Sequence, residues 1–174
     1  MNTNDPQQFI LGRRSIRAYA PGAISDVQIQ QLLEAAMAAP SARARDPWRF
    51  VVVRDSAVLT AIAAALPYGG MLAKAPLGII VVGELEAAHD QLLSYLLQDC
   101  SAAIENLLLS AHALGLGACW LGVHPREDRI HKLREILGLP GSVIPIAGIA
   151  IGHPGEQKEP RTRFNPDYVH WDKW

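Results

Sequence analysis

Hydrophobic residues recur along this chain in two patterns, one typical of helices and the other of buried strands. A spacing of three and four residues at Ile29, Leu32, Leu33, Ala36 and Met37 predicts a helix. Ser25 can cap its first turn, and Pro40 ends it because proline offers no amide hydrogen. Short apolar runs rich in β-branched residues predict strands at 50–53, 77–82, 118–123 and 144–151.

Four further helices follow from the same periodicity. Short ones are predicted at 6–12 and 56–65, and another at 125–137, with Pro125 in its first turn and Gly138 beyond its end. The longest covers 89–114, and its apolar positions occupy much more than one stripe. A helix that is apolar most of the way round is buried on several sides, so we expect one side to face another subunit.

The order of these elements bounds the fold class. Strands that alternate with helices are usual in a parallel α/β sheet, but this order also suits an α+β fold with a mixed sheet between helical layers. The 174 residues form one domain, 1–174. Residues 153–174 are polar and proline-rich yet carry Trp171 and Trp174, which predicts a tail that docks on a partner subunit.

Composition and charge exclude several functions. A net charge of −1 argues against binding to nucleic acid or to a membrane surface, and two cysteines are too few for a disulfide framework. The most apolar window contains Glu105, Asn106 and His112, so it is a poor membrane span. The N-terminus lacks a secretory pattern, and a cytoplasmic protein is predicted. The histidines and cysteines match no metal-binding motif.

Candidate chemistry gathers near the two ends of the chain. Arg13, Arg14, Ser15 and Arg17 are of the types that bind phosphate, since guanidinium groups form paired charge-assisted hydrogen bonds with it. The alternative is a solvated basic turn. Arg161 and Arg163 lie beyond the last predicted strand, where they either join this site or belong to a flexible tail.

A glycine-rich stretch, 115–122, begins like a dinucleotide-binding fingerprint. However, Trp120 occupies the third glycine position, and the stretch ends a helix and enters a strand, which is the reverse of the required context. A nucleotide site of that kind is therefore rejected. The small residues either let a flat ligand approach the backbone closely or simply end a helix.

Taken together, these motifs resemble the nitroreductase-like, FMN-dependent flavoproteins, of which this chain looks like a compact member. No single motif decides this, but their order and spacing are specific. The matching segments are 13–17 (RRSIR), 32–36 (LLEAA), 39–41 (APS), 47–50 (PWRF), 113–117 (ALGLG), 120–122 (WLG) and 160–163 (PRTR).

The resemblance implies an α+β fold and an obligate homodimer with one FMN in each of two interface sites. Arg13, Arg14 and Ser15 would then hold the phosphate and ribityl chain, and Arg161 and Arg163 would close on the phosphate. In the same way, Arg17 would reach the pyrimidine side of the ring, and Trp120, Leu121 and Gly122 would offer backbone near its reactive nitrogen. Pro40 and Ser41 would come from the partner.

The implied activity is a ping-pong, two-electron transfer from NAD(P)H to a small acceptor such as a nitroaromatic or a quinone. Such an enzyme needs few acid–base side chains, because the cofactor performs the electron transfer. Two alternatives stay open: another flavin reaction, such as reductive dehalogenation or flavin cleavage, and a non-catalytic flavin-binding or redox-sensing dimer.

The chain departs from the family pattern between its Pro-Ser and Pro-Trp motifs. Ala44 and Asp46 stand where the family often has asparagine and glutamine, with Arg43 and Arg45 beside them. These arginines suggest a preference for an anionic substrate or for the phosphate of NADPH.

Overall fold

The computed structural model describes residues 5–174, and its core is a five-stranded sheet between helices. The strands are β1 (Tyr19–Ala20), β2 (Trp48–Val53), β3 (Leu77–Glu84), β4 (Gly117–Gly122) and β5 (Val143–Pro154). The α-helices are α1 (Pro6–Gly12), α2 (Asp26–Met37), α3 (Ser56–Ala65), α4 (Leu93–Ala113) and α5 (Glu127–Leu137). Short 3₁₀ turns are η1 (Ala42–Ala44), η2 (Leu72–Lys74), η3 (Leu85–Ala87), η4 (His89–Gln91) and η5 (Pro166–Tyr168).

The long strand β5 organises the sheet. It pairs with β3 and β4, β2 pairs with β3, and β1 pairs with the end of β5 at His153 and Pro154. All four of these pairings are antiparallel, and a bridge between Ser15 and Ala118 adds a parallel contact. The fold is therefore α+β with a mixed sheet, as predicted, and not a parallel α/β sheet.

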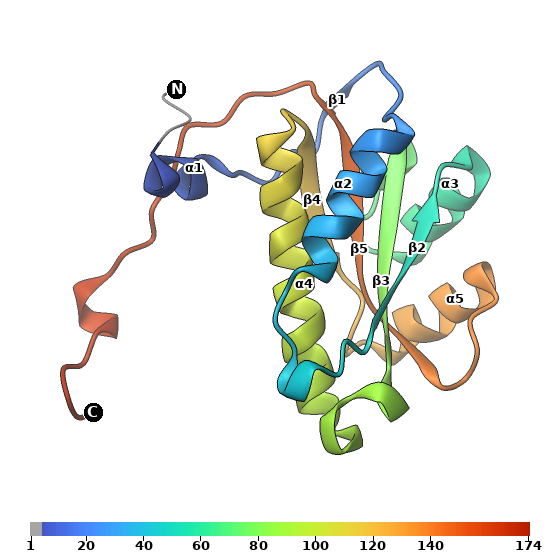
Figure 1. Ribbon diagram of the computed structural model, residues 1–174. Coiled ribbons are helices and arrows are strands. Elements are labelled where there is room, and N and C mark those ends of the chain that lie inside the picture. Colours follow the sequence, from blue (N-terminus) through green and yellow to red (C-terminus); the bar gives the residue numbers. More distant parts are fainter. Residues whose placement is uncertain (1–4) are drawn as a thin grey trace.

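Helices cover both faces of the sheet, which makes three layers (Figure 1). Side chains of a strand alternate between faces. On β3, Leu77, Ile79 and Val81 pack with α2 and α4, while Ile80 and Val82 pack with α3 and α5. Two apolar clusters result, one on each side of the sheet.

Helix α4 crosses one face and is buried on several sides, as its sequence predicted. Its fully buried side chains include Leu96, Ile104 and Leu107. It begins at Leu93, however, and not at residue 89, because His89–Gln91 form the separate turn η4 with Asp90 in the left-handed region. The predicted helix at 125–137 also begins later, at Glu127, so Pro125 precedes it.

Local signals in the sequence set other boundaries correctly. Ser25 accepts a hydrogen bond from the Gln28 amide, and the Gln28 side chain accepts one from the Ser25 amide, which forms a capping box on α2. Gly138 ends α5 with φ of 62°, a conformation that glycine adopts without strain. The two-residue strand β1 was not predicted, because it is too short to carry a hydrophobic alternation.

The last part of the chain after β5 leaves the body of the molecule, and its end lies away from the sheet (Figure 1). Four large aromatic side chains there are solvent-exposed: Phe164 (76%), Tyr168 (80%), Trp171 (85%) and Trp174 (102%). Such a run of exposed apolar surface is unusual for a monomer. The docking of this tail on a partner, expected from sequence, stays a prediction. No helix in residues 5–174 combines the length and apolarity needed to cross a membrane.

Candidate functional site

The arginine-containing segment runs in an extended conformation between α1 and β1, beside the edge of β4. The Ile16 amide donates to the Ala118 carbonyl over 3.0 Å. Ile16 faces Gly117 so closely that a Cβ atom on that glycine would lie 2.6 Å from its side chain. Glycine at 117 thus lets the segment approach β4. Because side chains of an extended chain alternate, Ser15 and Arg17 face away from this contact.

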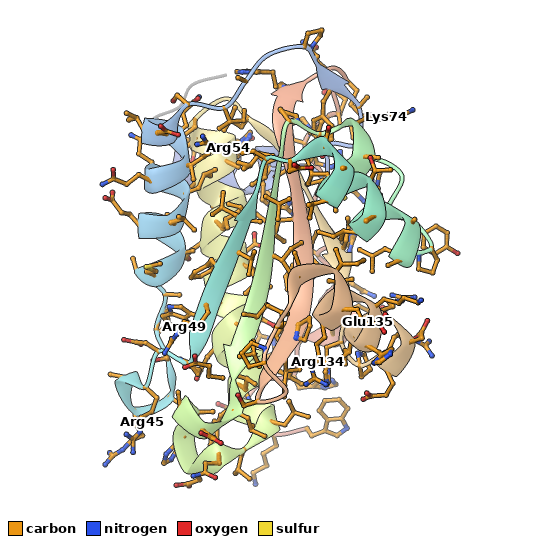
Figure 2. All side chains as sticks on the ribbon, turned by 90° about the vertical axis from the view of Figure 1, so that its right-hand side faces the viewer. Arg45, Arg49, Arg54, Lys74, Arg134 and Glu135 are labelled. Atoms are coloured by element: carbon orange, nitrogen blue, oxygen red, sulfur yellow. The ribbon has the colours of Figure 1, made fainter. Side chains whose placement is uncertain are left out.

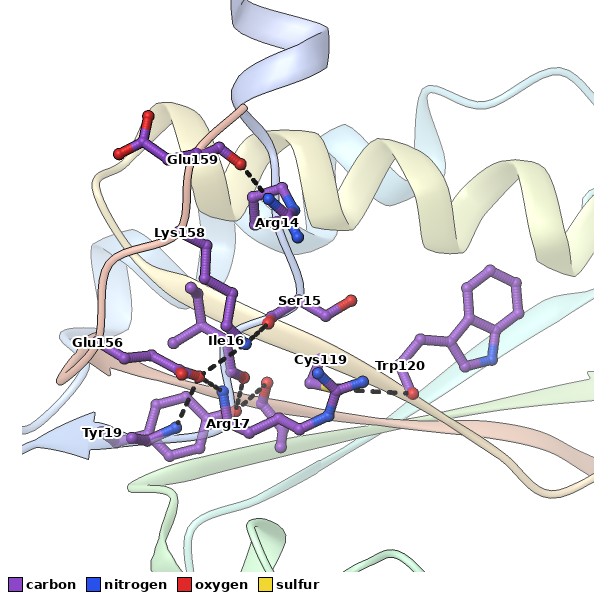
Figure 3. A network of polar contacts seen from close by, with 12 residues as sticks. Arg14, Ser15, Ile16, Arg17, Tyr19, Cys119, Trp120, Glu156, Lys158 and Glu159 are labelled. Carbon is purple, nitrogen blue, oxygen red and sulfur yellow. Dashed lines mark hydrogen bonds and ion pairs between the residues drawn. The ribbon is translucent and has the colours of Figure 1, made fainter. Parts of the chain in front are cut away.

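The first residues after β5 return along the same segment in the opposite direction. The Gly155 amide donates to the Ala18 carbonyl over 2.9 Å, and the Arg161 amide donates to the Leu11 carbonyl over 3.2 Å. Between these two points, the Arg14 guanidinium donates to the Glu159 carbonyl (Figure 3). The main chain of Arg161 is thereby bonded to Leu11, which lies two residues before Arg13. The sequence alone could not establish this proximity, because almost 150 positions separate the two arginines.

One of the predicted phosphate-binding side chains, Arg13, forms an ion pair with Glu105. Its Nε lies 3.2 Å from Oε1 of Glu105 on α4. A cavity of about 340 Å³ lies between this segment, the end of α4 and the chain after β5, and Arg13, Arg14, His112 and Lys158 contribute to its wall. Arg161 and Arg163 are exposed.

A second cavity, of about 600 Å³, lies along β4 and is lined by Arg17 and by the three residues predicted to meet a flat ligand, Trp120, Leu121 and Gly122. The guanidinium of Arg17 has no hydrogen bond or ion pair within residues 5–174. In Figure 3 it points along β4 toward Trp120, which is 38% exposed. A free cation and an aromatic ring thus border one cavity.

The backbone of β4 adds hydrogen-bonding groups to this cavity. The carbonyl of Ala118 points away from β5, since it accepts from Ile16. Backbone groups of a strand alternate between its two edges, so the N–H and C=O of Trp120 point to the same free edge. No strand pairs with that edge at Trp120 within the described residues. A planar ligand could therefore meet both backbone groups.

Several residues of these two walls were missed by sequence reasoning. Tyr68, Gly70 and Met71 line the cavity along β4, while Glu156 and Lys158 hold the arginine segment in place. Residues 67–70 (PYGG) have only the composition of a loop, and no local pattern marks a loop as part of a site. Glu156 and Lys158 are ordinary charged residues in a polar stretch.

Pro40 and Ser41 are not brought to Arg17 within one chain. The Ser41 hydroxyl donates to Asp46 over 2.5 Å, and the Ala42 amide donates to the buried carboxylate of Asp99 over 2.9 Å. Figure 2 shows Arg45, in this loop, at the end of the molecule opposite Lys74 of η2. The eight residues of β3 that separate these ends span roughly 25 Å.

The loop after Pro40 has an unusual backbone. Arg43, Ala44 and Asp46 have φ angles of 57°, 51° and 49°. Non-glycine residues in this region cost of the order of 1 kcal/mol each, and such strain gathers at functional sites. The hydrogen bonds of Ser41 and Asp99 hold the loop in this shape.

Burial changes the protonation of two groups near the arginines. Burial raises the pKa of the Cys119 thiol, although Arg17 and Lys158 oppose the shift, so the thiol stays protonated. Burial lowers the pKa of His112 from its usual 6.5, and the positive charge of Arg13 lowers it further. The imidazole of His112, whose centroid lies 5.0 Å from that of Phe9, is therefore neutral near pH 7.

The low pKa of His112 has a measurable consequence for stability. Below pH 6.5 the unfolded chain takes up a proton at this position before the folded protein does, so the free energy of unfolding falls as the pH drops. We expect the loss of stability between pH 7 and pH 5 to be smaller in His112→Gln than in the wild type. Denaturant titrations at several pH values would test this, and equal pH dependence in the two proteins would contradict it.

Comparison with known proteins identifies the fold that builds this site. Residues 10–66 and 63–153 match the sequence model of the nitroreductase family. The chain belongs to the nitroreductase family. Among curated nitroreductase-family relatives, a protein of Archaeoglobus fulgidus is 44% identical over 170 residues, covering 96% of this chain and 97% of its own length. It carries the name "Putative NADH dehydrogenase/NAD(P)H nitroreductase".

Solved nitroreductase-family structures agree over the whole chain. A protein of the same name from Parabacteroides distasonis superposes with a TM-score of 0.91 at 37% identity, covering 98% of this chain and all of the other. A structure from Desulfovibrio desulfuricans, described as a "putative nitroreductase in complex with fmn", has a TM-score of 0.84 and 34% identity, with 99% of both chains covered. The nitroreductase fold expected from the motifs is thus confirmed.

Proposed function

We propose that this protein is an FMN-dependent NAD(P)H oxidoreductase that reduces small nitroaromatic or quinone-type acceptors by a ping-pong mechanism. One observation carries the proposal. The free guanidinium of Arg17, the exposed ring of Trp120 and the edge of β4 at Trp120, which no strand pairs within residues 5–174, border a single cavity. This combination suits a planar ring that gains negative charge, because cations and backbone N–H groups stabilise such charge in a preformed site.

The residues present fit FMN at both of its ends. Arg13, Arg14 and Ser15 would hold the phosphate, and the main-chain contact between Arg161 and Leu11 supports a role for Arg161 beside them. Arg163 follows two residues later. Arg17 and the backbone of residues 120–122 would meet the ring. When bound, FMN supplies the two-electron chemistry, and the protein binds, orients and shields it.

A second copy of the chain would complete the site. Within one chain, the loop after Pro40 and Ser41 is bonded to Asp99 near the start of α4, whereas the segment of Arg17 lies beside Ala118, beyond the end of α4. Pro40 and Ser41 can therefore line the same ring only if they come from a partner. The exposed aromatic tail gives that partner a surface to bind. We therefore propose a homodimer with two interface sites, working in the cytoplasm, where NAD(P)H and small acceptors are available.

The first test is an absorbance spectrum of the purified protein before and after anaerobic addition of NADH or NADPH. Flavin bands that bleach on addition would support both the cofactor and its reduction. Bands that persist would contradict the proposed reaction and favour a non-catalytic flavin-binding dimer, while a protein that takes up no FMN would contradict the proposal altogether. Steady-state rates measured against donor at several acceptor concentrations should give parallel double-reciprocal lines.

A further inference from the structure

Within residues 5–174, the extended segment that carries Ser15 and Arg17 has no strand partner on the side away from β4. Its backbone groups are instead bonded by the chain that follows β5 (Figure 3). Oε1 of Glu156 accepts from the amide of Arg17 over 2.6 Å and from the amide of Ala18 over 3.3 Å. The Lys158 ammonium donates to the Ser15 carbonyl over 2.7 Å and lies 3.1 Å from the same Glu156 oxygen.

These contacts decide which way Arg17 points. If an extended chain shifts its register by one residue, every side chain moves to the opposite face. The contacts of Ile16 with β4 and of Glu156 with the next two amides leave Arg17 facing the cavity along β4. The Arg17 side chain makes no hydrogen bond or ion pair within residues 5–174 that would hold it there, so its direction depends on its main chain.

The charge on Glu156 matters for this arrangement. The hydrogen bond from the Arg17 amide is the main cause that lowers the pKa of Glu156, and the hydrogen bond and charge of Lys158 add to it. Its carboxylate is therefore ionised at neutral pH. Hydrogen bonds to a charged acceptor are roughly twice as strong as neutral ones.

We propose that Glu156 is a positioning residue, which fixes the main chain of Arg17 so that the guanidinium is held in the flavin cavity. Lys158 completes this arrangement by bonding Ser15 and neutralising the carboxylate. The inference rests on the proposed function, since it assumes that FMN occupies that cavity. It is specific in one respect: Glu156 acts on the bound flavin through Arg17 and not by direct contact.

A double-mutant cycle in the full-length protein tests this dependence. Glu156→Ala is expected to weaken FMN binding about 10-fold and to shift the midpoint potential of the bound flavin in the same direction as Arg17→Ala. In an Arg17→Ala background, Glu156→Ala should add less than 2-fold and no further shift of potential, because residues in one network are not additive. Glu156→Gln retains an acceptor oxygen, so it should lose less FMN affinity than Glu156→Ala and shift the midpoint potential less.

The controls separate positioning from folding. Glu86→Ala removes one exposed carboxylate that has no hydrogen bond or ion pair in the described chain, and it should change neither the FMN affinity nor the midpoint potential. Thermal unfolding of each apoprotein shows whether a variant is folded. Equal effects of Glu156→Ala with and without Arg17, or a change in stability with no change in potential, would overturn the inference. Wild-type protein that fails to bind FMN would instead overturn the proposed function.

Discussion

Deletion of residues 164–174 is expected to convert the proposed dimer into a monomer that does not retain FMN. The deletion removes Phe164, Tyr168, Trp171 and Trp174 and leaves both tail arginines in place. Each aromatic side chain can bury roughly 150–250 Å², so one tail offers about 600–1,000 Å², which is close to one partner's share of a standard interface. Loss of the partner would also remove Pro40 and Ser41 from the site.

Sedimentation velocity and flavin content measure the two parts of this prediction. The matched variant is full-length protein with Arg161→Ala and Arg163→Ala, which should lose FMN affinity but stay dimeric. It separates phosphate binding from assembly. A deletion variant that sediments as a dimer and keeps its flavin would show that the aromatic tail docks on nothing needed for the site.

Replacement of Arg17 by alanine is expected to weaken FMN binding or slow flavin reduction by about 10- to 100-fold. A hydrogen bond to a charged group contributes roughly 1.5–3 kcal/mol, and no other lysine or arginine among residues 5–174 lines the same cavity to substitute for it. Arg17→Lys should keep part of the wild-type FMN affinity and reduction rate, because the charge remains while the planar fork of donors is lost.

Fluorescence titration with FMN and stopped-flow reduction by NADH give the two quantities for Arg17→Ala. Arg126→Ala is a suitable control, since Arg126 is exposed and its side chain makes no hydrogen bond or ion pair within residues 5–174. Normal FMN content together with normal turnover in Arg17→Ala would contradict the role assigned to this residue.

Elements with strong local signals were predictable from sequence. The periodicity of α2, its Ser25 cap and the glycine after α5 each act within a few residues, so a local pattern contains the whole cause. Element boundaries were predicted wrongly, or an element was missed, where tertiary contacts set them or where the element was too short to leave a pattern. The turn at His89–Gln91 interrupts an apolar run, and β1 exists because Tyr19 and Ala20 reach the end of β5.

The site divides in the same way. Residue types and their order indicated a phosphate near Arg13, Arg14 and Ser15 and a flat ligand near 120–122, since those preferences belong to the side chains and backbone themselves. Only the tertiary structure decided that the chain after β5 runs back along Leu11–Ala18, which places Arg161 near Arg13 and Glu156 on the amide of Arg17. Contacts between residues about 140 positions apart depend on how the sheet closes, and no local periodicity encodes them.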